Sequence, residues 1–280
     1  MNRPAEGYLD AAEAGHSPRL HYLEWNVGAP GRTLFLLHGN SANASWWQPL
    51  ADAISPGFRL LALDQRGHGD SGWVRPAAYS PRDYAADVRR VISSLGLARP
   101  IVVGHSMGAI NTLALTQSEA DLIEAAVAIE VAVRSTRGRD RYLRRLRSLP
   151  TVTYLDHETA LRRFRLMPDE GEIAPEVLQR IAEYSITRNT DGAWTMKFDR
   201  ESFFGSDGLD VATAIASSHI PLLLIRAEHS RIMTLESARG AALSNPAARL
   251  VEIPRVHHHL IIERADLVAR EIEAFIAHLG

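Results

Sequence analysis

The fold is decided by residues 101–108, which read Ile-Val-Val-Gly-His-Ser-Met-Gly. An apolar run typical of a buried strand leads into the pattern G-x-S-x-G, and the residues that follow are typical of a helix. On such a strand-to-helix turn the serine is exposed, and the two glycines avoid collisions with neighbouring backbone. This context predicts that Ser106 is a nucleophile, whereas the pentapeptide alone could be an ordinary glycine-rich turn.

Apolar runs of strand length recur along the chain, with helical stretches between them. The expected strands are Leu20–Trp25, Thr33–Leu37, Arg59–Leu63, Pro100–Val103, Ala125–Ile129, Pro221–Ile225 and Ala248–Ile253. The expected helices are Trp46–Ile54, Pro81–Leu95, Ser106–Gln117, Leu235–Leu243 and Ala265–His278. This alternation predicts an α/β fold with a mostly parallel sheet flanked by helices on both faces.

The alternation stops between Ala132 and Ser218, where the sequence is polar, rich in arginine and helical in character. Because the strand pattern resumes afterwards, we expect a helical cap at residues 132–218, inserted into a core built from residues 1–131 and 219–280. Residues 1 to about 16 are expected to form a poorly anchored extension.

The composition limits the classes of protein to consider. A chain of 280 residues that is 46% hydrophobic can bury one sizeable core. No stretch approaches the ~20 apolar residues of a membrane span, and the first residues lack the apolar core of a signal peptide, so we expect a cytoplasmic protein. A net charge of −2 gives no reason to expect nucleic acid or membrane as a partner. Without cysteine, the chemistry must use serine, histidine and carboxylates, and we expect no cofactor and no metal.

Together with three further segments, the pentapeptide resembles the motifs of the α/β-hydrolase superfamily. These segments are His38-Gly39, the run Asp64-Gln65-Arg66-Gly67-His68-Gly69-Asp70-Ser71 and a late histidine. The resemblance covers residues 20–280 apart from the insertion, and it implies the α/β-hydrolase fold. It also implies an oxyanion hole made by the backbone amides of Asn40 and Met107. We expect the run from Asp64 to Ser71 to be structural.

A serine hydroxyl needs a base within hydrogen-bond reach. Members of the superfamily carry a glutamate five positions after their histidine, and Glu263 stands five positions after His258. His258 is therefore the predicted base. His257 and His259 remain competitors, because they lie six and four positions before the same glutamate.

The acid that would support this histidine departs from the usual pattern. Most members of the superfamily carry an aspartate shortly after the next-to-last strand, and Ser230 stands at that position here. Some members take the acid from the end of an earlier strand, which points to Glu130. The alternative is Glu228, although its side chain could instead pair with a nearby arginine.

Ten arginines lie between Arg134 and Arg165, against three acidic residues. Because a guanidinium binds a carboxylate through two parallel hydrogen bonds, the cap could select a small anionic substrate. The candidate substrate contacts are His38, Arg145, Arg147 and Arg165. Any single arginine could instead lie on a solvated helix face.

These residues predict a serine hydrolase, an esterase or amidase that cleaves an ester, amide or enamide of a small substrate through an acyl-enzyme. Within the superfamily, the pattern is similar to that of (E)-2-(acetamidomethylene)succinate hydrolase and its relatives, whose acid is an aspartate where this chain has Glu130. The alternatives are a cofactor-free dioxygenase of the same fold and a ligand receptor without activity. In each case the expected partner is a small molecule.

Overall fold

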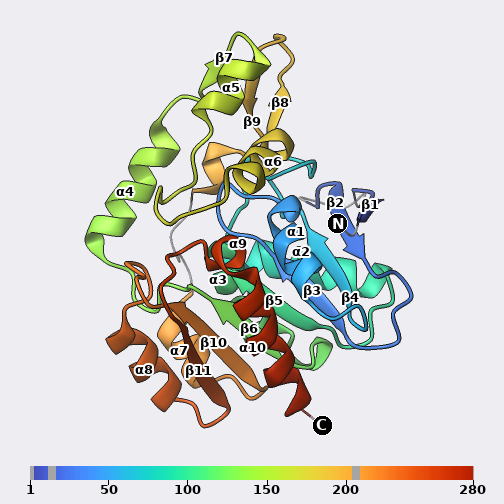
Figure 1. Ribbon diagram of the computed structural model, residues 1–280, viewed down its shortest axis with the longest axis vertical. Helices are drawn as coiled ribbons and strands as arrows, with labels where there is room; N and C mark the ends of the chain where they lie inside the picture. The colour runs from blue at the N-terminus through green and yellow to red at the C-terminus, as the bar shows by residue number, and fades with distance from the viewer. Residues whose placement is uncertain (1–2, 12–16, 204–208, 280) are drawn as a thin grey trace.

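An eight-stranded sheet forms the centre of the molecule in the computed structural model, which describes residues 3–11, 17–203 and 209–279 (Figure 1). The strands are β1 Ala5–Leu9, β2 Leu20–Trp25, β3 Thr33–Leu37, β4 Arg59–Leu63, β5 Ile101–His105, β6 Ala126–Ile129, β10 Leu222–Ala227 and β11 Ala248–Ile253. Their order across the sheet is β1-β2-β4-β3-β5-β6-β10-β11. Since β2 alone is antiparallel to both of its neighbours, the strands from β4 to β11 all end at one edge.

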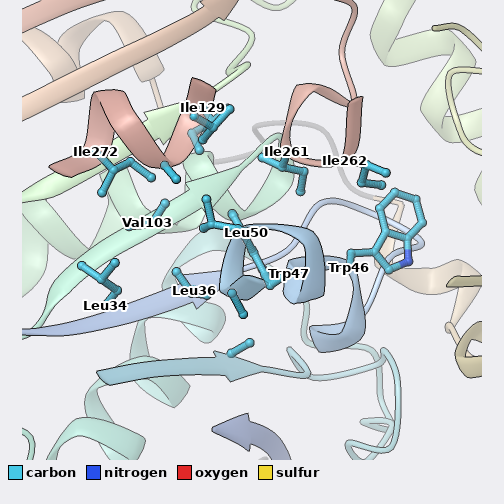
Figure 2. Close-up of a cluster of buried hydrophobic side chains, with 14 of the residues drawn as sticks. Leu34, Leu36, Trp46, Trp47, Leu50, Val103, Ile129, Ile261, Ile262 and Ile272 are labelled. Atoms are coloured by element: carbon cyan, nitrogen blue, oxygen red, sulfur yellow. The ribbon is translucent and has the colours of Figure 1, made fainter. Parts of the chain in front are cut away.

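Helices cover both faces of the sheet, which explains why its central strands are apolar throughout. One face carries α1 Gln48–Ala53, α9 Leu260–Glu263 and α10 Ala265–Ala277, and the other carries α2 Pro81–Ser94, α3 Met107–Ser118, α7 Val211–Ala216 and α8 Leu235–Leu243. Successive residues of a strand point to opposite faces. Leu34 and Leu36 of β3 therefore join Leu50 of α1 on the first face (Figure 2), whereas Phe35 packs on the second.

The predicted order of strands and helices in the core is confirmed. β2, β3, β4, β11 and α8 begin and end at the predicted residues. β5 and β10 are longer than predicted, because His105 and Ala227 still pair with the neighbouring strands. The turn from Asp64 to Ser71 is structural as expected: its first carboxylate accepts hydrogen bonds from the backbone amides of Ala44 and Asp70.

The predicted loose extension at the N-terminus is wrong for the residues of β1. Ala5–Leu9 pairs antiparallel with β2 along its whole length, and Arg90 of α2 donates a hydrogen bond to the carbonyl oxygen of Asp10. Most side chains of β1 are exposed, because the strand lies at the edge of the sheet. An edge strand of this kind lacks the apolar pattern that marks the central strands.

The inserted segment between β6 and β10 stands beyond the sheet at one end of the molecule (Figure 1). It contains α4 Arg137–Ser148, α5 His157–Arg163, α6 Pro175–Ser185 and a small antiparallel sheet of β7 Thr153–Tyr154, β8 Ile186–Arg188 and β9 Trp194–Met196. This segment is therefore not purely helical, and it is shorter than the predicted range of 132–218 because α7 packs on the core beside α3. None of the described helices combines the length and apolarity needed to cross a lipid bilayer.

Replacing Leu50 by alanine should lower the free energy of unfolding by about 2–5 kcal/mol, because it leaves a cavity in the fully buried cluster of Figure 2. The matched control is Leu155→Ala, which truncates a leucine that is 96% exposed and should change stability by less than about 0.5 kcal/mol. Urea unfolding of both variants tests the assignment of the core. Equal losses in the two variants would contradict it.

Candidate active site

Ser106 lies on a sharp turn between β5 and α3, at the edge where the parallel strands end. Its φ of 55° and ψ of −112° place it outside the common backbone regions, a strain that concentrates at functional sites. The turn leaves no room for a side chain at Gly108, where a Cβ atom would lie 2.0 Å from the carbonyl oxygen of Leu37. The predicted nucleophile elbow is thus present as a backbone geometry.

Glu130 follows β6 directly and is fully buried. Its φ of 55° is also positive, and its amide is held by a 2.9 Å hydrogen bond to the carbonyl oxygen of Ile225 in β10. The turn directs the carboxylate along the strand ends, where Oε1 accepts a 2.7 Å hydrogen bond from the amide of Ala227. A buried acid is thereby fixed one strand away from Ser106.

The ring of His258 meets this acid. Its Nδ1 lies 3.1 Å from Glu130 Oε2, and both side chains are buried, with exposed fractions of 2% and 0%. A proton on Nδ1 satisfies this contact and leaves Nε2 free to accept one. The ring is not hydrogen-bonded to the hydroxyl of Ser106, although both residues line the same cavity. Such catalytic contacts are often open in enzymes without substrate.

Ser230 occupies the position where the usual acid was expected, and its hydroxyl binds the carboxylate that replaces that acid. Ser230 Oγ donates a 2.6 Å hydrogen bond to Glu130 Oε2. The same oxygen accepts hydrogen bonds from the amides of Ile232 and Met233, at 3.1 and 2.9 Å. The sequence shows that the usual aspartate is missing at this position, but it does not show the contact that Ser230 makes.

Burial controls the protonation of the pair. It raises the pKa of Glu130 to about 7, against the hydrogen bonds from Ser230 and Ala227 and the charge of Arg226, which lower it. Burial also lowers the pKa of His258 well below its usual value, helped by the neighbouring His259 and Arg139. The imidazole is therefore neutral near neutral pH and can act as a base.

The two competing histidines, His257 and His259, make hydrogen bonds with other groups. Glu263 accepts hydrogen bonds from the amide and Nδ1 of His257, at 3.1 and 3.3 Å. His259 Nε2 lies 2.8 Å from the carbonyl oxygen of Pro168. Only His258 contacts an acid at the strand ends, and its carbonyl oxygen is held 2.8 Å from Nε2 of His105 in β5.

A cavity of about 500 Å³ opens over Ser106 and His258 beneath α4. Arg134, Arg139 and Arg231 line it. Arg139 is half-buried, burial lowers the pKa of its guanidinium, and this side chain makes no ion pair with any residue in the described ranges. The cavity therefore presents a cation without an ion-pair partner among the described residues.

The predicted substrate contacts lie away from this cavity. Arg145 is exposed, Arg147 pairs with Glu201, and Arg165 donates to the carbonyl oxygens of Arg162 and Phe164. Of the arginines that do line the cavity, Arg134 and Arg139 belong to the ten candidates, and Arg231 lies outside that stretch. They could not be chosen from sequence, because the sequence does not show which side chains face the cavity.

His38 and Glu228 are also placed outside the cavity. The ring of His38 is fully buried, donates from Nδ1 to the carbonyl oxygen of Gly39 and accepts at Nε2 from the amide of Gln65, so it cannot contact substrate. Glu228 is exposed, and its carboxylate accepts a hydrogen bond from the amide of Arg255. The structure therefore brings Glu130 to His258 and leaves the alternative acid apart.

The backbone amides predicted to form the oxyanion hole belong to residues on the cavity wall. Asn40 lines the cavity together with Ser106, and Met107 lines a smaller hollow of about 40 Å³ that also reaches Ser106. Neither amide donates a hydrogen bond to a described residue. Both donors are thus available to a ligand.

One group of described side chains comes close enough to share a cation, namely His21, Asp64 and Asp70. The carboxylate of Asp64 is already occupied by backbone amides and by His21 Nδ1, 2.6 Å away. None of the three residues lines the cavity. The group is accounted for as part of the turn after β4.

The chain belongs to the alpha/beta hydrolase family, whose sequence profile matches residues 34–271. It is 25% identical over 249 residues to the 2-(acetamidomethylene)succinate hydrolase of Mesorhizobium japonicum, covering 88% of each chain. It is 26% identical to an esterase of Mycobacterium tuberculosis, over 81% of this chain and 76% of the other. The crystal structure of E-2-(acetamidomethylene)succinate hydrolase superimposes with a TM-score of 0.83 at 23% identity, over 98% of this chain and 100% of that one. These relatives identify the protein as a hydrolase and confirm the predicted family and fold.

Replacing Ser230 by alanine should destabilise the protein more above the pKa of Glu130 than below it. The folded-state pKa of about 7 lies above the usual value of 4.5, so the stability linked to the protonated acid is present at low pH and lost as the pH rises through about 7. The hydroxyl of Ser230 offsets part of that loss by donating to the ionised form. We expect the loss caused by Ser230→Ala to be about 1–2 kcal/mol larger at about pH 9 than at about pH 6.

Urea unfolding at the two pH values provides the measurement. Ser93→Ala removes an exposed hydroxyl from α2 and should show no such pH dependence. A loss of equal size at both pH values would mean that Ser230 does not support the ionised acid.

Proposed function

We propose that the protein is a serine hydrolase that cleaves an ester, amide or enamide bond of a small, carboxylate-bearing substrate through an acyl-enzyme. The buried hydrogen bond between Glu130 and His258, beside a half-buried serine on a strained turn, is the observation that carries this proposal. The relatives named above are a 2-(acetamidomethylene)succinate hydrolase and an esterase, which is in keeping with it.

In the proposed reaction, Ser106 Oγ attacks the carbonyl carbon while Nε2 of His258 takes the hydroxyl proton. The carbonyl oxygen becomes an oxyanion and receives hydrogen bonds from the amides of Asn40 and Met107. When the bond to the leaving group breaks, His258 returns the proton to that group. Water then attacks the acyl-enzyme by the same route, which releases the acid and restores the serine.

Glu130 supports this cycle by holding the ring of His258 and by stabilising the imidazolium that forms during each proton transfer. A glutamate does here what an aspartate does at the usual position. Glu130 follows β6, whereas the usual acid follows the neighbouring strand β10. The glutamate side chain still reaches His258 Nδ1, at 3.1 Å. The hydroxyl of Ser230 and the amide of Ala227 keep the carboxylate in the orientation that this contact needs.

The substrate class follows from the charge of the cavity. Arg139 lines both hollows that reach Ser106, and its guanidinium makes no ion pair within the described ranges of the chain, although the charge of Asp140 opposes the effect of burial on its pKa. A half-buried cation without a partner favours a substrate that supplies a carboxylate. We therefore propose an acyl group that carries an acid at the end remote from the cleaved bond.

A fluorophosphonate probe tests the nucleophile and its acid together. The native protein should be labelled, and Ser106→Ala should abolish labelling. Glu130→Gln should slow labelling by at least about a hundredfold, because the imidazolium loses its counter-charge. Glu228→Gln, which changes an exposed carboxylate two residues from Ser230, should leave the rate within about twofold.

Two results of this experiment would overturn the proposal. An unlabelled native protein that is folded would point to a binding protein or to chemistry without a serine nucleophile. Slow labelling in Glu228→Gln combined with a normal rate in Glu130→Gln would transfer the acid to Glu228.

Replacing Arg139 by glutamine should reduce kcat/KM for the mono-p-nitrophenyl ester of adipic acid by about tenfold or more, because the terminal carboxylate loses its cation. The rate for p-nitrophenyl hexanoate, which has the same chain length and no charge, should change by less than about threefold. Arg145→Gln is the matched control on α4, since Arg145 is exposed and should affect neither ester. Equal losses for the charged and uncharged esters would contradict a role in recognising the acid.

A further inference from the structure

The wall of the cavity carries one carboxylate among its described lining residues, that of Glu170. Its position beside the catalytic histidine calls for an explanation, because the reaction proposed above does not use it. We propose that Glu170 is a specificity-determining residue that accepts a hydrogen bond from the N–H of the bond to be cleaved, and so directs the site towards amides rather than esters. This inference rests on the proposed function and names the class of bond.

Glu170 is held in place from two directions. Its Oε1 accepts a 3.3 Å hydrogen bond from the backbone amide of His258, and its own amide donates to the carbonyl oxygen of Pro168 at 3.1 Å. The next residue, Gly171, has a φ of +88° and lies so close to Glu263 that a Cβ atom would fall 2.6 Å from its carboxyl carbon. Residues 170–171 of the inserted segment therefore pack closely against the segment from His258 to Glu263, and Glu170 lies at this contact.

The second oxygen of Glu170 accepts no hydrogen bond from the residues that the structure describes. No side chain or amide in the described parts of the chain gives it a hydrogen bond, and the carboxylate makes no ion pair with the arginines that line the same cavity. Glu170 is half-buried, and a carboxylate oxygen that no described residue binds gains by accepting a hydrogen bond from a ligand.

The position of this oxygen selects the donor that it can meet. The leaving group must lie near His258, because the ring of His258 returns the proton to it. Glu170 is hydrogen-bonded to the backbone amide of the same histidine. The leaving nitrogen of a secondary amide carries an N–H group, whereas the leaving oxygen of an ester carries only lone pairs. An ester would therefore place lone pairs against a carboxylate, and an amide would satisfy it.

The test compares the mono-p-nitroanilide and the mono-p-nitrophenyl ester of adipic acid, which share one acyl group. In Glu170→Gln, the side-chain oxygen must stay on the His258 amide, since turning the side-chain amide over would set two donors against each other. A donor then faces the cavity in place of an acceptor. We expect the anilide-to-ester ratio of kcat/KM to fall by about tenfold or more.

Glu172→Gln is the matched control, because Glu172 is an exposed carboxylate two residues along the same loop and should leave the ratio unchanged. An unchanged ratio in Glu170→Gln would overturn the inference. Native protein that cleaves the ester and not the anilide would overturn it as well. Failure of the proposed function is a separate result, in which the native protein neither cleaves the ester nor reacts with the fluorophosphonate.

A purely structural role for Glu170 has its own signature. If the residue only positioned His258, Glu170→Gln would lower both rates together and would move the pH at which ester hydrolysis is half-maximal. The inference requires that this pH stays within about 0.3 units of the native value, while the ratio of the two rates changes.

Discussion

The candidate active site depends on the register of three parallel strands. His105 of β5, Ile129 of β6 and Ile225 of β10 lie side by side in the sheet; β5 and β6 end at this level, whereas β10 continues to Ala227. The residues that follow β5 and β6 are Ser106 and Glu130, and both have a φ of 55°. Each holds its amide on the carbonyl oxygen of the adjacent strand, at 2.9 Å. Backbone strain of about 1–3 kcal/mol at each turn is tolerated because the ladder continues through it.

The sequence predicts the sheet well because its central strands are buried on both faces and are therefore apolar throughout. The same argument explains the misses. β1 is an edge strand with exposed side chains, and the small sheet of β7, β8 and β9 consists of two- and three-residue strands without a periodic pattern. The predicted insertion of residues 132–218 includes α7, because position along the chain does not reveal whether a helix packs on the core or on the inserted segment.

The sequence likewise predicts some residues of the candidate site and not others. Ser106 and His258 follow from motifs whose spacing is local, and Glu130 follows from its place at a strand end. Ser230 contacts Glu130, 100 positions away, and Glu170 contacts His258, 88 positions away. No local sequence pattern predicts contacts over such separations. The choice among the arginines required knowledge of which side of α4 faces the cavity. Arg139 faces inward and Arg145 outward on one helix, although their sequence surroundings are alike.

The contact between Ser230 and Glu130 has a consequence for how this family can diverge. A residue after β10 and a residue after β6 reach the same point beside His258, which means that the fold offers two places from which one negative charge can be supplied. A lineage can pass from one to the other through an ancestor that carries both acids, and the two carboxylates would then share a proton. Loss of the acid after β10 leaves a hydroxyl that serves the remaining one. The carboxylate that contacts the histidine can thus come from either of two strands, while the histidine keeps its position.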